Sequence, residues 1–230
     1  MYHLARALYL QWTSKPEYSI ILLGLDNAGK TTLMSQIKAL FNTTASSEDA
    51  ALGATGDLAP SSTAGNTVPT VGQNVATIDL PDMYIKIWDV GGQLTLRRLW
   101  ASYYKSAHAV VFVTPSTPTT PWTPMSPLMA NLGRLEECKA VLESVLSHED
   151  TAGIPILVLA NKQDREDCLE VVRIKEGFVR KVFEGEKGGM VRDSRVLPVS
   201  ALKGTGVKEA VEWVKSRVMW NKDARPPVMR

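Results

Sequence analysis

"GLDNAGKTT" spans Gly24–Thr32 and directly follows the apolar run Tyr18–Leu23. It matches the pattern G-x-x-x-x-G-K-[ST], in which glycines let successive backbone N–H groups converge on a phosphate at the start of a helix. The lysine reaches the β- and γ-phosphates, and the hydroxyl that follows it ligates Mg²⁺. The alternative is an ordinary glycine turn between a strand and a helix. We predict a phosphate-binding loop formed by Asp26, Asn27, Ala28, Gly29, Lys30, Thr31 and Thr32.

Apolar runs and helical stripes alternate along the rest of the chain, which predicts an α/β fold with a mostly parallel sheet and helices on both faces. One pair of runs differs, because only Pro81 and Asp82 separate Asn74–Leu80 from Met83–Trp88. A two-residue connection is too short for a crossover, so these strands should form an antiparallel hairpin. The other predicted strands are Ile20–Leu23, Ala109–Val113, Ile154–Ala160 and Val196–Val199.

Composition predicts one domain. The chain has 230 residues, of which 44% are hydrophobic, and a net charge of +2, so nothing calls for a nucleic-acid partner. We expect an N-terminal helix and linker over residues 1–17, a main domain over 18–220 and a flexible tail over 221–230. Residues 43–68 are rich in Ser, Thr, Ala and Gly, and residues 114–127 carry five prolines. Both stretches are predicted to be inserted loops.

A second motif predicts the base. Asn161-Lys162-Gln163-Asp164 follows a predicted strand, and a carboxylate at Asp164 can accept hydrogen bonds from the N1–H and 2-amino groups of guanine. Adenine offers no such pair of donors, so an adenine nucleotide would leave the charge unpaired. Asn161 should brace the loop and the stem of Lys162 should lie along the base. Backbone N–H groups of Ser200, Ala201 and Leu202 are candidates to meet the guanine O6.

A third motif predicts the hydrolytic residues. Asp89 ends a strand and suits Mg²⁺ through a water molecule, the N–H of Gly92 can approach a γ-phosphate, and Gln93 can orient an attacking water. Thr70, in "PTVG", is the candidate to close a loop over Mg²⁺. Lys30, Thr70 and Gln93 are therefore the predicted catalytic residues, and Thr31, Thr70 and Asp89 the predicted metal residues.

These residues resemble the Arf family of small GTPases. The shared stretches are "GLDNAGKTT", "PTVG", "WDVGGQ", "LWASYY", "LANKQD" and "SALKGTGV", in family order over most of residues 18–220. Within the family, the sequence is most similar to a Golgi subgroup of Arf-related proteins. The resemblance implies a six-stranded doubly wound sheet and a Mg²⁺-dependent GDP/GTP switch that cycles between cytoplasm and the cytosolic face of Golgi and trans-Golgi membranes. It also implies exchange factors, GTPase-activating proteins, effectors, a Golgi membrane-protein receptor and a monomeric state.

Two features predict slow intrinsic hydrolysis. Residues 43–69 contain neither arginine nor lysine, so this loop cannot supply the cationic group that is worth about 10³–10⁵ in rate. Asp26 also stands in the phosphate loop where relatives that hydrolyse GTP faster have a glycine. Two alternatives remain open: a scaffold locked on its nucleotide without significant hydrolysis, which Gln93 argues against, and an ATP-dependent kinase or ATPase, which Asp164 argues against.

Membrane and partner contacts are predicted from apolar side chains. Tyr2 excludes N-myristoylation, yet residues 2–12 place Leu4, Leu8, Tyr9 and Trp12 on one helical face. We expect this face to contact membranes when GTP is bound, and the alternative is a helix packed permanently on the core. Trp88, Leu99, Trp100 and Tyr103 are the predicted effector-binding group, and the alternative for each of them is plain core packing. Gln73 stands where the family usually completes that surface with an apolar residue.

Overall fold

The structure, a computed structural model, describes residues 14–45, 69–116, 127–166, 168, 171–176 and 193–230. The predicted N-terminal helix therefore lies outside the described residues. In chain order the strands are β1 (Pro16–Leu23), β2 (Gln73–Leu80), β3 (Met83–Val90), β4 (Ala109–Pro115), β5 (Ile156–Asn161), β6 (Ser194–Pro198) and β7 (Val228–Met229). The helices are α2 (Lys30–Ala45), α3 (Leu94–Arg97), α4 (Ala101–Tyr104), α5 (Pro127–Leu146), η1 (Glu149–Thr151), α6 (Val171–Ile174) and α8 (Val207–Trp220).

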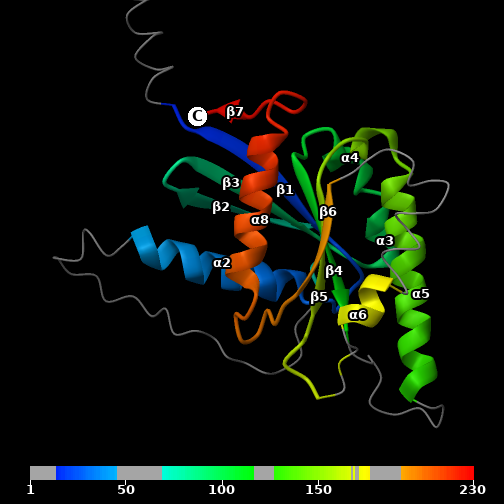
Figure 1. Cartoon of the computed structure of the whole chain (residues 1–230). Coiled ribbons are helices and arrows are strands. Elements are labelled where there is room, and N and C mark those ends of the chain that lie inside the picture. The colour runs from blue at the N-terminus through cyan, green and yellow to red at the C-terminus, as the bar shows by residue number, and fades with distance from the viewer. Residues whose placement is uncertain (1–13, 46–68, 117–126, 167, 169–170, 177–192) are drawn as a thin grey trace, which may run out of the picture.

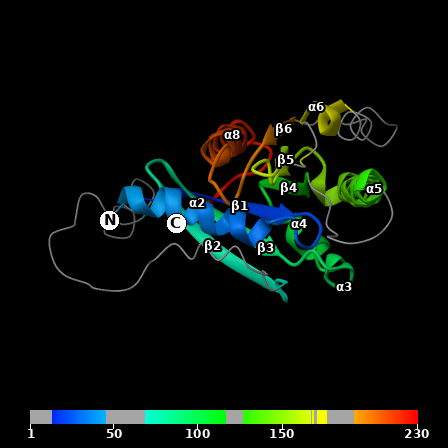
Figure 2. The same cartoon turned by 90° about the horizontal axis from the view of Figure 1, so that it is seen from below.

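The sheet confirms the predicted topology. Along the strand order β2-β3-β1-β4-β5-β6, every neighbouring pair is parallel except the hairpin β2–β3, and the short β7 joins off this path by pairing antiparallel with β1. Helices cover both faces, as Figure 2 shows: α2 and α8 lie on one side, and α4 and α5 on the other. Alternate residues of β1 divide between two cores, because Ile20 and Leu22 face α2 and α8 whereas Ile21 and Leu23 face α5. No helix among the described residues is long and apolar enough to cross a membrane.

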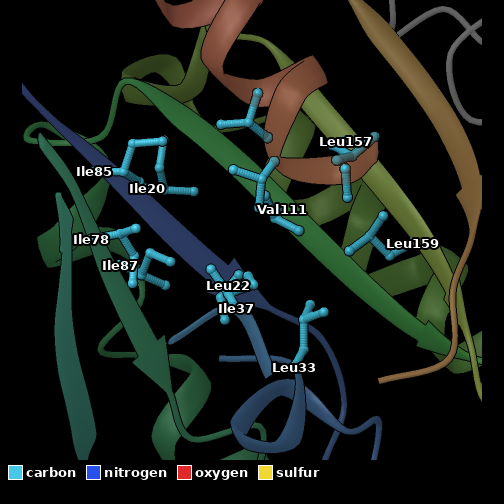
Figure 3. A pocket seen from close by; sticks show the side chains of 13 residues that line it. Ile20, Leu22, Leu33, Ile37, Ile78, Ile85, Ile87, Val111, Leu157 and Leu159 are labelled. Carbon is cyan, nitrogen blue, oxygen red and sulfur yellow. The ribbon is translucent and has the colours of Figure 1, made fainter. Parts of the chain in front are cut away.

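The core beneath α2 and α8 contains one apolar cavity of about 30 Å³ (Figure 3). Its lining is entirely hydrophobic and comes from both helices and five strands, including Ile20, Ile85 and Val111. A cavity of this volume could hold a water molecule only if polar groups were present to bind it. We therefore interpret it as a packing gap in the core, and none of the predicted site residues lines it.

The predicted loop boundaries need correction. Helix α2 continues to Ala45, so residues 43–45 are helical and not part of the first insertion. Thr114 and Pro115 belong to β4, where they pair with Ala160 and Asn161, and Pro127 begins α5. Ladder pairing with β5 overrides the turn-forming composition of this stretch, and residues 46–68 and 117–126 lie outside the described part of the chain.

The prediction of a flexible tail over 221–230 also differs from the structure, which folds the tail back onto the domain (Figure 1). β7 pairs antiparallel with the start of β1, next to the carboxyl terminus. Arg225 donates hydrogen bonds to the carbonyl oxygens of Tyr104, Lys105, Ala107 and Asp150 at 2.5–3.3 Å. Three of these carbonyls lie at the end of α4 and in the residues that follow it, where cationic side chains are favoured, and the fourth belongs to η1. Arg230 forms an ion pair with Glu17 at 3.0 Å.

Candidate active site

The predicted phosphate loop connects β1 to α2, and its glycines are required by close contacts. Gly24 and Gly29 have φ angles of +138° and +92°, in the region that side chains rarely adopt. A Cβ atom at Gly24 would lie 2.1 Å from the backbone oxygen of Val113, and one at Gly29 would lie 2.3 Å from Nδ2 of Asn161. Both positions therefore exclude any other residue in this conformation.

Lys30 is buried, with 6% of its surface exposed, at the first position of α2. Its Nζ donates to the carbonyl oxygens of Gly24 and Leu25 at 3.0 and 2.9 Å. Burial lowers the pKa of Lys30 to about 8, against the opposing effects of Asp89 and Asp26. The ammonium thus lies inside the loop, where keeping it charged costs free energy. A bound polyanion would offset this cost.

Three predicted metal residues converge beside this lysine. The hydroxyl of Thr31 donates to Oδ2 of Asp89 at 2.7 Å and lies 2.8 Å from the hydroxyl of Thr70. Because the Thr31 proton points to Asp89, the Thr70 hydroxyl is the donor of the second bond. Asp89 is fully buried, and its Oδ1 is one of three buried side-chain atoms without a partner in the described residues.

This donor set fits Mg²⁺. An unpartnered buried carboxylate oxygen beside two hydroxyls supplies hard oxygen ligands, and Mg²⁺ takes its other ligands from water and substrate phosphates. No group of three His, Cys, Asp or Glu side chains is placed to hold a metal within the described ranges.

The loop after β3 packs directly on the phosphate loop. A Cβ atom at Gly92 would lie 2.5 Å from the backbone nitrogen of Asp26 and the backbone oxygen of Gly24. Gln93 precedes α3, and its side chain makes no capping hydrogen bond. Nε of Arg97 donates to the Gly92 carbonyl at 2.9 Å, and Nη2 forms an ion pair with Glu137 of α5 at 2.8 Å.

The motif Asn161–Asp164 follows β5 and is tied to its neighbours. Nδ2 of Asn161 donates to the Ala28 carbonyl at 2.7 Å, and its Oδ1 accepts from the Ala201 N–H at 2.9 Å. Asn161 therefore braces the phosphate loop and the Ser200 loop at once, as the sequence predicts. Since the Ala201 N–H is directed to Asn161, its bond to a base stays a prediction.

Two further contacts shape the predicted base site. Oδ1 of Asp164 accepts from the Ser200 hydroxyl at 2.5 Å, which holds the carboxylate beside the second loop. Nζ of Lys162 lies 3.4 Å from Oδ1 of Asn27, so the lysine bridges toward the phosphate loop. Leu202 is exposed, and its contact with the base also stays a prediction.

The predicted effector group divides in two. Trp88 and Tyr103 lie with ring centroids 5.6 Å apart, Leu99 is 44% exposed, and the Tyr103 hydroxyl donates to Oε1 of Gln73. Trp100, in contrast, is only 2% exposed and its indole N–H donates to the Gly91 carbonyl at 3.1 Å. Including Trp100 in a contact surface was therefore wrong, because the short turn between α3 and α4 directs its ring into the core.

Comparison with known proteins agrees with this geometry. The profile of the ADP-ribosylation factor family matches residues 4–47 and 58–218. The chain belongs to the Arf family of small GTPases. Members of this family hydrolyse GTP, so the chain is a GTP hydrolase.

Individual relatives cover the whole chain. The chain is 42% identical over 231 residues to ADP-ribosylation factor-like protein 3 of Saccharomyces cerevisiae, covering 100% of both. It is 38% identical over 230 residues to ADP-ribosylation factor-related protein 1 of Homo sapiens, covering 100% of this chain and 98% of the relative. The solved Arl6 BBS3 small GTPase of Trypanosoma brucei, with the bound nucleotide analogue GppNp, matches with a TM-score of 0.64 and 25% identity. That match covers 88% of this Arf-family chain and 98% of the solved chain.

Reasoning from the sequence missed two residues near the site. Arg97 contacts the Gly92 carbonyl and α5, and Ser116 lies fully buried beside the base motif. Ser116 falls in the proline-rich stretch that the sequence predicts to be an inserted loop, but its hydroxyl contacts the Asn161 carbonyl at the end of β5, 45 positions later. Only the strand register brings them together.

Proposed function

We propose that this Arf-family GTPase is a Mg²⁺-dependent GDP/GTP switch in vesicle and protein transport at the cytosolic face of Golgi and trans-Golgi membranes. The observation that carries the switch is the convergence of Thr31, Thr70 and Asp89 beside Lys30. Thr70 belongs to a segment that precedes the β2–β3 hairpin, so its place at this site can report the terminal phosphate. The relatives named ADP-ribosylation factor-related protein 1 support a place among the Arf-related proteins, and the Golgi setting rests on the sequence resemblance to the Golgi subgroup.

The chemistry follows from this geometry. Lys30 would hold the β- and γ-phosphates, and a Mg²⁺ ion held by Thr31, Thr70 and, through a water molecule, Asp89 would neutralise their charge. The N–H of Gly92 would bind the γ-phosphate, since no side chain separates this backbone from the phosphate loop. Gln93 would orient the water whose oxygen attacks the γ-phosphorus, so that the bond to GDP breaks and inorganic phosphate leaves.

Slow intrinsic hydrolysis is part of the proposal. Within the described residues, Arg97 is the arginine that contacts the loop beside Gln93, and it is already engaged by the Gly92 carbonyl and by Glu137. It can reach a phosphate only by giving up these bonds. We expect a single-turnover rate below about 10⁻² s⁻¹, the speed of enzymes with a built-in catalytic arginine, and strong acceleration by an activating protein.

Membrane recruitment would depend on residues 2–12, whose side chains Leu4, Leu8, Tyr9 and Trp12 would contact lipid. Because a short amphipathic helix binds membranes weakly, a Golgi membrane-protein receptor would provide a second anchor. Trp88, Leu99 and Tyr103 would contact effectors, while exchange factors load GTP.

The test has two parts. Calorimetry with Mg²⁺ should show binding of GDP and GTP in preference to ATP, and Asp89→Asn should weaken the dependence on Mg²⁺. Fractionation of Golgi membranes should then recover the GTP-loaded chain in the membrane pool and the GDP-loaded chain in the soluble pool, with deletion of residues 2–12 abolishing the difference. Equal partitioning of both forms of the full chain would contradict the membrane switch.

A further inference from the structure

The loop that recognises the base contains a strained residue. Lys162 has a φ angle of +68°, one of only two positive values at non-glycine residues within the described chain. A side chain in this region of backbone space costs free energy and persists only where the surroundings hold it. Asp164, the predicted guanine acceptor, lies two residues further on, so its position depends on the groups that hold this turn.

Ser116 contacts the loop on both sides of Lys162. On the amino side, the Ser116 N–H donates to the Asn161 carbonyl at 3.0 Å, and the Ser116 hydroxyl donates to the same oxygen. On the carboxyl side, the Ser116 hydroxyl accepts from Nε2 of Gln163 at 2.8 Å. The Gln163 N–H also donates to the Val199 carbonyl at 3.2 Å. One buried hydroxyl therefore joins the residue before the strained position to the residue after it.

The setting makes these bonds strong determinants of loop geometry. Ser116 is fully buried directly after β4, whose parallel ladder with β5 ends at the pair Pro115–Asn161. The hydroxyl has used its single proton on Asn161 and accepts from Gln163, so its orientation is fixed. Loss of a buried partner leaves the remaining polar group unsatisfied, which costs more than an exposed bond.

We propose that Ser116 is a positioning residue for guanine recognition, which acts with Gln163 to hold the Asn161–Asp164 loop in the conformation that presents Asp164 to the base. The inference rests on the proposed binding of guanine nucleotides at this site. It assigns a specificity role to a residue of β4's end, outside the motifs that contact the nucleotide.

The experiment compares GDP with IDP, whose hypoxanthine base lacks the 2-amino group that Asp164 would bind. Dissociation constants for both are measured with Mg²⁺ for the full chain, Ser116→Ala, Gln163→Ala and the double variant. We expect Ser116→Ala to weaken GDP binding about tenfold and to lower the preference for GDP over IDP. Gln163→Ala should act in the same direction, and the double variant should be less impaired than the product of the two singles, since both remove one network.

Two readouts separate positioning from a general loss of structure. The rate of hydrolysis of saturating GTP in a single turnover should stay within about twofold of the parent, because the phosphate residues are untouched. The matched control is Ser147→Ala, which removes an exposed serine directly after α5 whose hydroxyl donates to the Glu143 carbonyl. It should change neither the dissociation constant for GDP nor that for IDP.

Each outcome has a distinct meaning. If the parent chain binds neither GDP nor IDP, the proposed nucleotide function itself fails. If the parent prefers GDP but Ser116→Ala and Gln163→Ala keep the full preference, Ser116 does not position the loop. A fall in GDP affinity with an unchanged GDP/IDP ratio also overturns the inference, since that result indicates only a loss of stability. Should Ser116→Ala fail to fold, Gln163→Ala alone decides between these outcomes, because Gln163 is only half-buried.

Discussion

Replacing Arg225 by alanine should destabilise the chain through the tail and not through the active site. The guanidinium donates four hydrogen bonds, to the carbonyls of Tyr104, Lys105, Ala107 and Asp150. Hydrogen bonds to a charged group contribute about 1.5–3 kcal/mol each, but these share one partly solvated group and will not add. We expect a loss of about 2 kcal/mol, which corresponds to about 4–8 °C in Tm for a chain of this size.

Thermal unfolding in saturating Mg²⁺ and GDP measures this loss, with the same ligand excess for each variant because binding raises Tm by mass action. Arg225→Lys should give an intermediate Tm, since one ammonium cannot reach acceptors on both Tyr104 and Asp150. The matched control is Lys222→Ala, an exposed cation of the same tail, which should shift Tm by no more than about 1–2 °C. If Arg225→Ala has the same Tm as the Lys222→Ala control, the claim that the docked tail stabilises the domain is refuted.

Three further predictions concern the site and its surroundings. Burial lowers the pKa of Lys30 to about 8, and a bound polyphosphate should raise this pKa again, because it favours the charged lysine. When GDP affinity is titrated from pH 7 to pH 9, it should therefore fall by up to about tenfold per pH unit above pH 8. Gly92→Ala places a methyl group 2.5 Å from backbone atoms of the phosphate loop, which should displace the N–H proposed to bind the γ-phosphate. Because GDP lacks this phosphate, the ratio of GTP to GDP affinity should fall at least about tenfold in competition binding. Trp100→Ala should cost about 3–5 kcal/mol in denaturant unfolding, whereas the exposed Leu99→Ala should cost under about 1 kcal/mol and instead weaken effector capture.

The placement of the candidate site residues could be predicted from sequence because each motif combines local geometry with chemistry, whereas their binding of nucleotide stays a prediction. "GLDNAGKTT" encodes its own turn, and a run of apolar residues before each motif places it at a strand end. Parallel strands bring their carboxyl ends to one edge, so Thr31 and Asp89 meet although 58 positions separate them. Thr70 was harder, since it follows a long insertion, yet its hydroxyl lies where the motif order predicts.

The tail could not be predicted in this way. Its composition, with Pro226 and Pro227 and no periodic apolar pattern, is typical of a flexible end. What orders it is a set of backbone carbonyls 75 to 121 positions earlier, and carbonyls carry no sequence signal. The burial of Trp100 was missed for a related reason, because helices of four residues are too short to show a periodic buried face.

The tail and the active site lie at opposite ends of one strand, which separates their expected effects. β1 begins at Pro16, where β7 pairs with it, and ends at Leu23, where the phosphate loop starts. Between these ends, β1 pairs with β3 and β4 and its side chains fill both cores. Loss of the tail therefore removes a support from one end of β1 without moving a residue that is proposed to bind the nucleotide. Arg225→Ala should therefore keep the parent's GDP affinity at temperatures well below its Tm. Ser116→Ala should instead bind GDP more weakly than the parent at every temperature. This contrast tests whether each residue acts on stability or on recognition of the base.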